Sequence, residues 1–493
     1  MDTTPTLYAA GRVYSPADPA ATALLTEGGR ITWLGPRAEA PAAARVVDLG
    51  GALVTPAFVD AHVHATDTGL ALSGLDLTAC ESAEDVLDMV LAKAAHSTGV
   101  IMGHGWDLTD PPTAAELDAA AGGRPVYLTR IDKHSALVSP VLLKEAEGHT
   151  GHDENGWVKI EAHHAVRTAA YATMGLAERT GAQRLALRHA ASLGIAAVHE
   201  CGGPLISSEA DFTSLLALEG DYPEVYGYWG ELGGAAKARE LGAAGAGGDL
   251  FADGAFGSRT ACVRDPYTDG GCGHAYLTAE EVGAHLAECT RLGMQGGFHA
   301  IGDAAIKAVT GGFAIAAAQV GVEALREARH RVEHAEMLDK ELIAAFVEYG
   351  IVASMQPAFD RLWGGEAGMY ADRLGKQRAL SLNPFAALKG VGVTLAFGSD
   401  SPVTPLDPWG GVHAAANHHH PVHRISRRAA FAAHTRGGWR AVKKDEEGVL
   451  VPGGPATFAA WDAPAGPDGL PGLEGGSPRC VRTVLRGRTI HEE

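Results

Sequence analysis

Eight short apolar segments recur through the middle of the chain, and helix-like stretches lie between most of them. Each segment ends in polar residues, as in GIAAVHECGG and VTLAFGSDSPV. The segments span residues 53–65, 194–203, 224–232, 248–258, 294–305, 329–338, 350–359 and 393–403. Repeated strand–helix units of this kind are typical of a (β/α)8 TIM barrel, whose active site lies at the carboxyl ends of its strands. We therefore predict an α/β fold of this class.

The two ends of the chain share a different pattern, made of short strand-like runs and turns. Near the amino end, EGGR lies between two apolar runs and is a hairpin signal. We expect residues 1–55 and 445–493 to form one small composite β-sandwich. Residues 56–444 would then form the barrel, inserted between the two parts of the sandwich.

More than a hundred residues separate the first two predicted barrel strands, which is too long for an ordinary loop. This segment, residues 66–190, contains strand-like runs of its own, GVIMGHGWDL and RPVYLTRIDKHSALVS. Long insertions in such places usually carry lids or substrate-binding loops. We therefore expect an inserted, lid-like subdomain over the barrel mouth.

Charge and composition exclude several classes of function. The formal net charge of −19 argues against a nucleic-acid partner, because phosphate binding needs clustered Lys and Arg. No run approaches the ~18 consecutive apolar residues of a membrane span, and the start of the chain lacks the basic and apolar regions of a signal peptide. We expect a cytoplasmic protein that acts on a small molecule, with no nucleic-acid or membrane partner. The sequence leaves open whether the protein forms a homo-oligomer.

Histidine and aspartate occur at the predicted carboxyl ends of several barrel strands. In VDAHVHATDTG, His62 and His64 lie two residues apart and so face the same side of the first strand. His299 ends the fifth strand, His334 the sixth and Asp400 the eighth. Imidazole and carboxylate ligands suit Zn²⁺ or a similar divalent ion, which lowers the pKa of bound water to about 7. An HxH pair alone is weak evidence, but all four elements in this order predict a metal site.

Several phrases are similar to the amidohydrolase superfamily, and within it to the YtcJ-like branch that includes N-substituted formamide deformylase. They are TPAFVDAHVH, LFADGAFGSRTA, FHAIGDAAI, RHRVEHAEML, ASMQPAF and LAFGSDSPVTPLDPWGGVHAA, and the resemblance covers nearly the whole chain. It implies a distorted barrel with a composite sandwich, and hydrolysis of an amide-like C–N bond. It also implies metal or near-metal roles for His62, His64, His299, His334 and Asp400. Asp400 would in addition act as the base that moves a proton from water to the leaving nitrogen.

Strand four departs from the pattern of this branch. Many members have a lysine four residues before the DG of the strand, and that lysine bridges two metal ions once it is carbamylated. The residue here is Asp249, which cannot be carbamylated but could bridge two ions through its own carboxylate. Alternatively, the site holds a single ion while His334 polarises the substrate. The ligands of that ion would be His62, His64, His299 and Asp400. Glu200, at the end of strand two, is a further candidate ligand. We favour Asp249 as a ligand and leave the choice between one and two ions open.

Candidate substrate-binding residues lie in the insertion. RIDKHSALVS resembles an R-x-D-G-H phrase of the branch, with Lys133 in place of the glycine. Arg130, Asp132 and His134 would either bind substrate or orient the metal-site groups. A structural salt bridge under the lid is an equal alternative.

Four further features have less specific interpretations. Arg259, on the loop after strand four, would bind a substrate carboxylate or stabilise its loop. Gln356, on strand seven, would contact substrate or a loop. Trp106 ends a strand of the insertion and is expected to pack in a core. The histidine run NHHHPVHR (417–424) lies after strand eight, and we expect a solvated surface segment rather than a metal cluster.

The leading hypothesis is a metal-dependent hydrolase that cleaves a linear amide or N-formyl-type C–N bond, other than a peptide bond, with a metal-activated water. The alternative is a deaminase or cyclic-amide hydrolase with a mononuclear metal site on the same fold. Deaminase-like members tend to have a glutamate three residues after the strand-five histidine, where this chain has Gly302 followed by Asp303. A non-enzymatic member is a third hypothesis, and retention of the other ligands argues against it.

Overall fold

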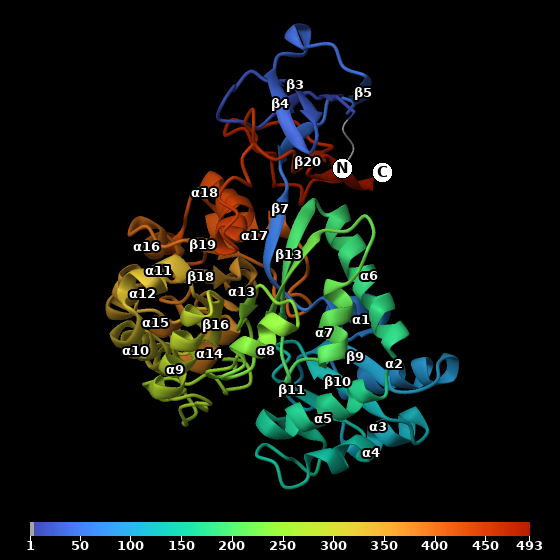
Figure 1. Ribbon diagram of the computed structural model, residues 1–493. Coiled ribbons are helices and arrows are strands. Elements are labelled where there is room, and N and C mark those ends of the chain that lie inside the picture. Colours follow the sequence, from blue (N-terminus) through green and yellow to red (C-terminus); the bar gives the residue numbers. More distant parts are fainter. Residues whose placement is uncertain (1–3) are drawn as a thin grey trace.

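The computed structural model describes residues 4–493 and contains the predicted barrel (Figure 1). Its strands are β7 (Phe58–Val63), β13 (Ile195–Gly202), β14 (Glu224–Trp229), β15 (Gly245–Ala246), β16 (Gln295–Ala300), β17 (Arg331–His334), β18 (Val352–Met355) and β19 (Leu395–Phe397). They pair in this order as one sheet, and every neighbouring pair is parallel. An isolated parallel bridge between Val63 and Ser401 joins the end of β7 to the chain after β19 and nearly closes the barrel.

Strand four is shorter than predicted and lies earlier in the chain. The sequence predicts it within residues 248–258, but β15 consists only of Gly245–Ala246. Within the predicted segment, only Phe251 pairs with a barrel strand, through an isolated bridge to His299. Gly248 has a φ of 75°, a left-handed conformation that ends the extended backbone. The predicted bounds are therefore wrong, and Asp249 projects from a loop just beyond the strand.

Helices follow the barrel strands and lie either outside the barrel or at its mouth. They are α6 (Leu176–Ser192), α7 (Glu209–Leu216), α8 (Ala235–Glu240), α9 (Ala279–Arg291), α10 (Asp303–Val320), α11 (Val322–Ala328), α12 (Lys340–Tyr349), α13 (Pro357–Trp363), α14 (Met369–Leu374), α15 (Lys376–Ala379), α16 (Phe385–Gly390), α17 (Pro408–Ala416), α18 (Arg427–Ala432) and α19 (Gly438–Ala441). Their apolar faces turn to the sheet; Ile306 and Phe313 of α10, for example, are buried in the barrel core. Within the described residues, no single helix is long and apolar enough to cross a membrane; α10 and α11 meet that test only as a pair bent by 116°.

Segments from both ends of the chain pair in two small sheets. The strands are β1 (Thr6–Ala9), β2 (Arg12–Val13), β3 (Ala23–Glu27), β4 (Arg30–Gly35), β5 (Arg45–Asp48), β6 (Leu53–Pro56), β20 (Phe458–Trp461), β21 (Cys480–Leu485) and β22 (Arg488–Glu492). One sheet has the order β4-β3-β1-β5 and the other β2-β6-β20-β21-β22. Leu24, Ile31 and Tyr8 of the first sheet and Val54 and Phe458 of the second share one buried cluster. The arrangement is the composite sandwich that the sequence predicts, and its exact boundaries stay a prediction.

The chain between β7 and β13 folds around a sheet of its own. Its strands are β8 (Leu75–Asp76), β9 (Ile101–Trp106), β10 (Val126–Arg130), β11 (Ser135–Val138) and β12 (Trp157–Lys159), in the order β12-β11-β10-β9-β8. Its helices are α1 (Ala65–Ser73), α2 (Ala83–His96), α3 (Ala114–Ala121), α4 (Pro140–Leu143) and α5 (Ile160–Ala172). Figure 1 shows this part at the lower end of the molecule, where β7 runs into α1, and the sandwich at the opposite end. The insertion therefore lies at the carboxyl end of the first barrel strand; its bounds of 66–190 and its role as a lid stay predictions.

Aromatic side chains join the sandwich to the barrel. Phe58, at the start of β7, packs edge-on against Trp409 of α17 and Trp461 of β20, with ring centroids 4.9 and 5.7 Å apart. Trp461 also donates from its indole nitrogen to the Thr55 hydroxyl at 2.9 Å. These contacts fix the strand that carries the first histidine pair.

Candidate metal centre

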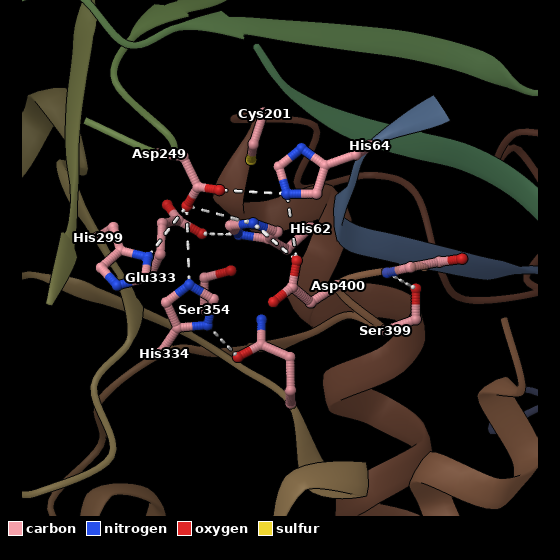
Figure 2. A network of polar contacts seen from close by, with 12 residues as sticks. His62, His64, Cys201, Asp249, His299, Glu333, His334, Ser354, Ser399 and Asp400 are labelled. Atoms are coloured by element: carbon pink, nitrogen blue, oxygen red, sulfur yellow. Dashed lines mark hydrogen bonds and ion pairs between the residues drawn. The ribbon is translucent and has the colours of Figure 1, made fainter. Parts of the chain in front are cut away.

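Six side chains meet at the carboxyl ends of the barrel strands (Figure 2). They come from the ends of β7, β16 and β17 and from the loops after β15 and β19, and all six are buried. They are four imidazoles and two carboxylates: His62, His64, Asp249, His299, His334 and Asp400. The structure thus brings together the whole predicted ligand set, whereas the further candidate Glu200 lies outside it.

Asp249 lies at the centre of this group. Its Oδ1 is 3.5 Å from Nε2 of His62, 3.4 Å from Nδ1 of His299 and 3.7 Å from Nε2 of His334. Its Oδ2 is 3.1 Å from Nε2 of His64. The two oxygens of one carboxylate therefore face different histidines.

Asp400 faces the first histidine pair from the opposite side. Its Oδ1 is 3.2 Å from Nε2 of His64 and 3.5 Å from Nε2 of His62, and its backbone N–H donates to the His62 carbonyl at 2.8 Å. Asp400 and His334 have φ values of 56° and 67°, which cost non-glycine residues energy. Such conformations cluster at functional sites, where the surrounding structure holds them.

The charges of these groups depend on one another. Burial lowers the pKa of His64. The hydrogen bonds of His64 to Asp249 and Asp400, and the negative charges of these two carboxylates, outweigh burial and raise that pKa to about 10. Burial raises the pKa of Asp249, but the surrounding imidazoles hold it well below its ordinary value. Carboxylates placed among imidazoles in this way attract cations, whether protons or a metal ion.

The unpaired atoms of the cluster test whether a metal ion fits. Among the described residues, Nε2 of His62, Nε2 of His334 and Oδ1 of Asp400 are buried without a hydrogen-bond partner. Leaving such atoms unpaired costs about 1–3 kcal/mol each. Ligand atoms of His62, Asp249 and His334 lie within 4.8 Å of one another, as do those of His62, His64 and Asp400. Imidazole and carboxylate donors suit Zn²⁺ or another divalent ion, so the residues fit a metal.

Two side chains outside the cluster orient its rings. Glu333 accepts a hydrogen bond from Nδ1 of His62 at 2.9 Å, and Gln356 accepts one from Nδ1 of His334 at 2.8 Å. Both rings therefore direct Nε2 at Asp249. Burial raises the pKa of Glu333, but Arg331 beside it lowers that pKa to about 2, so Glu333 is an anion. A carboxylate behind a ligand histidine raises the basicity of that ligand.

Cys201 is a neighbour of the cluster that the sequence patterns do not single out. It lies near the end of β13, and its sulfur is within 4.8 Å of ligand atoms of His62 and Glu333. Burial raises the pKa of this thiol to about 12. The sequence signal that could have identified Cys201 is its position two residues after His199, which places the two side chains on the same side of strand two. His199 itself contacts Nη1 of Arg331 at 3.0 Å, below the cluster.

Other polar residues at the strand ends hold the backbone. Glu200 accepts a hydrogen bond from the Ala65 N–H at 2.7 Å, and it belongs to no ligand group within residues 4–493. Asp253 accepts hydrogen bonds from the N–H groups of Ile301 and Gly302 at 2.9 and 2.8 Å, just after His299. These carboxylates position the chain on either side of the candidate ligands.

A pocket opens beside the cluster, and His299, His334 and Asp400 form part of its wall. Much of the remaining wall is aromatic: Phe256, Phe359, Trp363 and Tyr370. The Phe359 ring stacks on His334 with centroids 5.9 Å apart. Sequence patterns alone do not separate these aromatic residues from ordinary core residues.

The predicted substrate-binding residues fall into two groups. Asp132 and His134 line the pocket. Arg130 is buried and pairs with Asp132 at 2.5 Å, as well as with Asp107, which is the structural salt bridge of the alternative interpretation.

The other two candidates do not line the pocket. Arg259 pairs with Asp269 at 2.7 Å and its side chain is 40% exposed, which favours the interpretation that it stabilises its loop. Gln356 is buried against His334 rather than at the pocket wall.

Two sequence expectations outside the site have clear outcomes. Trp106 is buried and donates from its indole nitrogen to the Leu128 carbonyl at 2.8 Å, so it packs as expected. The histidine run is only partly solvated, and that prediction is wrong for His418, which is buried with Nε2 3.4 Å from Oδ1 of Asp360. The buried Asp360 carboxylate, which also contacts His419, draws the run against α13.

Comparisons with known proteins agree with this geometry. Residues 45–491 match the model of the Amidohydrolase family. The chain is 28% identical over 421 residues to a Bacillus subtilis protein named as the amidohydrolase YtcJ, which covers 75% of this chain and 74% of that protein. It is 26% identical over 446 residues to an imidazolonepropionase of Cereibacter sphaeroides, with 90% and 88% covered. An uncharacterized metal-dependent hydrolase from Pyrococcus furiosus superposes with a TM-score of 0.73 at 26% identity, covering 93% of this chain and 99% of that one.

Proposed function

The chain belongs to the amidohydrolase family and is a metal-dependent hydrolase, and from this premise we propose that it cleaves linear amide or N-formyl-type C–N bonds of small molecules, with Zn²⁺ as its metal. The observation that carries the proposal is the convergence of four imidazoles and two carboxylates, with unpaired atoms directed inward, beside a largely aromatic pocket.

Asp400 is the proposed base. When bound, a divalent ion supplies Lewis acidity that lowers the pKa of a coordinated water to about 7. Asp400 lines the pocket, and its Oδ1 lies 3.2 Å from Nε2 of His64 and 3.5 Å from Nε2 of His62, so once these ring nitrogens hold the ion the carboxylate would accept a proton from water. The same carboxylic acid then protonates the leaving nitrogen, which an amide needs in order to depart. In the single-ion arrangement, His334, which faces the same pocket, would polarise the substrate carbonyl.

Asp249 is the proposed bridge between two ions. Its Oδ1 faces His62, His299 and His334, and its Oδ2 faces His64. Because its two oxygens contact different histidines, Asp249 would be able to hold two ions and to take the place of the modified lysine of the branch. A single ion is the competing arrangement.

The pocket favours an uncharged, hydrophobic substituent on the substrate. No Lys or Arg of the described chain lines it. Besides Asp400 it has two carboxyl groups, and both are already engaged: Asp132 by Arg130 and Ser258, and Glu336 by the Tyr370 hydroxyl at 2.7 Å. An anionic group on the substrate would therefore find no counter-ion in this pocket.

The deaminase or cyclic-amide alternative draws support from the likeness to imidazolonepropionase. Against a deaminase, Gly302 stands where a glutamate would be expected. The next residue, Asp303, is held by Arg264 at 2.7 Å on the surface side. Asp253, whose Oδ1 is 3.8 Å from Nε2 of His299, accepts hydrogen bonds from the backbone N–H groups of Ile301 and Gly302, so it is already engaged and does not replace that glutamate.

A substrate panel with the Zn²⁺-loaded protein separates the two functions. We expect N-formyl amines and linear amides with apolar substituents to release an amine and a carboxylate. Release of ammonia from amino-heterocycles, or ring opening of cyclic amides, without turnover of linear amides would overturn the proposal in favour of the alternative. Asp400→Asn protein is the control for contaminating hydrolases.

A further inference from the structure

A hollow of about 400 Å³ lies where the sandwich meets the outside of the barrel, and we call it the junction hollow. Small-molecule sites usually enclose ~300–1,000 Å³, so this hollow has room for an organic ligand. One wall comes largely from β2 and the loop that follows it, and the other from α18 and the segment after α18. The junction hollow shares no lining residue with the pocket beside the metal centre.

The inner surface of the junction hollow is apolar. Its buried lining residues include Val13, Pro56, Phe431 and Leu450. The Tyr14 ring, which also lines the hollow, stands edge-on to the Phe431 ring with centroids 5.6 Å apart. Removing a ring or a hydrocarbon chain from water against such a surface is favourable. The inner surface therefore suits the carbon skeleton of a ligand.

Three exposed arginines bring positive charge to the same hollow: Arg12, Arg428 and Arg436. Within residues 4–493, none of the three forms an ion pair with a carboxylate, and no Asp or Glu lines the hollow. Nε of Arg428 donates to the backbone carbonyl of Asp468 at 2.8 Å, whereas the Asp468 carboxylate is directed to Arg427 at 3.6 Å. Acidic side chains outnumber Lys and Arg by 59 to 40 in the whole chain, so these arginines form a local excess of the opposite charge.

The wall that carries Arg436 has an uncommon backbone conformation. Residues Ala433–Gly437 form a π-helical segment, and such segments occur frequently at functional sites. On its other side, His434 of this segment packs edge-on against Phe58 of β7 and Phe397 of β19. This wall is therefore built on the barrel core and not on a free loop.

We propose that the junction hollow binds an organic phosphate ester. Its phosphate would lie at the arginines and its carbon skeleton on the apolar inner surface. Guanidinium groups donate paired hydrogen bonds to phosphate oxygens, and a phosphate monoester carries about two negative charges at pH 7, which several arginines balance better than one. The proposal concerns binding alone and does not rest on the reaction at the metal centre.

Isothermal titration calorimetry of the metal-loaded, full-length protein with phenyl phosphate tests this proposal. We expect saturable binding of one ligand per chain. Inorganic phosphate lacks the ring and phenol lacks the charge, so each should bind at least about tenfold more weakly. This comparison separates a site for an amphipathic anion from a surface that attracts any anion.

Ala432→Glu tests the location of the site. Ala432 is exposed at the end of α18 and lines the junction hollow, so a carboxylate there would occupy the arginines and repel the phosphate. Affinity should fall about tenfold or more. Ala432→Gln, which has nearly the same size without the charge, is the matched control and should bind phenyl phosphate as the natural chain does.

Arg436→Gln tests the arginines directly and should also weaken binding about tenfold. Arg45→Gln, at an exposed arginine of β5 outside the hollow, should leave the affinity unchanged. Circular dichroism and Tm establish that each variant is folded. Because Ala432→Glu and Arg436→Gln change two different exposed side chains, either one tests the site if the other fails to fold.

Several results would overturn the proposal. They are the absence of saturable binding, equal affinities for phenyl phosphate and inorganic phosphate, and an unchanged affinity in the folded Ala432→Glu or Arg436→Gln protein. Binding that disappears when the metal is removed would place the phosphate at the metal centre instead. Because the titration needs no turnover, its failure leaves the proposed hydrolase function standing, and an inactive protein that still binds phenyl phosphate would refute that function alone.

Discussion

Asp249 stands where four imidazoles meet, and its side chain decides how many cations this end of the barrel can hold. It is buried, and its two oxygens contact different histidines. A lysine would need a covalent modification to offer two oxygens, whereas aspartate carries them from the start. The shorter side chain is accommodated because Asp249 projects from a loop beyond the short strand β15, next to Gly248.

Replacement of Asp400 by asparagine tests the base. The amide keeps the shape of the side chain but cannot take a proton from water, so kcat should fall about 10²- to 10⁴-fold. The circular dichroism spectrum and Tm should stay close to those of the natural chain. An unchanged kcat for Asp400→Asn would remove this residue from the mechanism.

Glu333→Gln tests the support behind His62. Glu333 accepts the Nδ1–H hydrogen bond of His62, and loss of its charge should weaken metal affinity about 10- to 100-fold. Competition with a chromophoric chelator measures that affinity. Glu323→Gln, at a side chain that is 84% exposed, is the control and should bind metal normally. Equal affinities in the two variants would show that Glu333 does not tune the site.

At the scale of elements, the junction between β7 and the chain after β19 closes the barrel and aligns two sets of ligands. Asp60 accepts hydrogen bonds from the His62 N–H at 3.2 Å and from the Ser399 N–H at 2.9 Å, so one carboxylate ties the first strand to the eighth. Gly398 lies in this junction. A Cβ there would be 2.5 Å from the His62 backbone nitrogen.

Gly398→Ala should therefore destabilise the protein by about 1–3 kcal/mol through overpacking, and it should also lower metal affinity. Gly181→Ala is the control, because a Cβ in this exposed position of α6 meets nothing within 4 Å. The control should be neutral or stabilising by up to about 1 kcal/mol, since alanine favours a helix. Chemical denaturation measures both. A Gly398→Ala protein as stable as the control would contradict the close approach.

The sequence predicts elements better than it predicts contacts between them. Periodicity and strand-end polarity locate seven of the eight barrel strands, and together with the family resemblance they single out the six candidate ligands. They fail for β15, because glycine conformations there depend on the packing of neighbouring strands. They also miss the role of Glu333, which is 271 residues from the histidine that it orients. The aromatic wall of the pocket has no periodic pattern that separates it from the core.

Across the whole molecule, cation binding at the barrel end is coupled to folding. The ligands come from β7, β16 and β17 and from the loops after β15 and β19, so they meet only in the folded chain. An ion that binds only the folded state stabilises it by mass action. The same carboxylates stabilise protonated histidines when no ion competes.

The pH dependence of Tm for chelator-treated protein follows from this coupling. The folded-state pKa of His64 is about 10, above the ordinary value of 6.5. Its protonation therefore stabilises the fold fully below pH 6.5, and this contribution is lost as the pH rises towards 10. Tm should fall over this range without metal and should fall less with Zn²⁺, which replaces the proton. Parallel curves for the two forms would show that metal and protons do not share this site.

Metal content per chain, measured by inductively coupled plasma mass spectrometry, tests the central claim most directly. We predict that the natural chain retains zinc or another divalent ion in a ratio of one or two per chain. His62→Ala, which removes a residue shared by both ligand groups, should retain almost none. Asp249→Ala should lose at least one ion relative to the natural chain. The contradicting result is a natural chain that holds no divalent metal and hydrolyses its substrate undiminished after chelation, or an unchanged metal ratio in both variants.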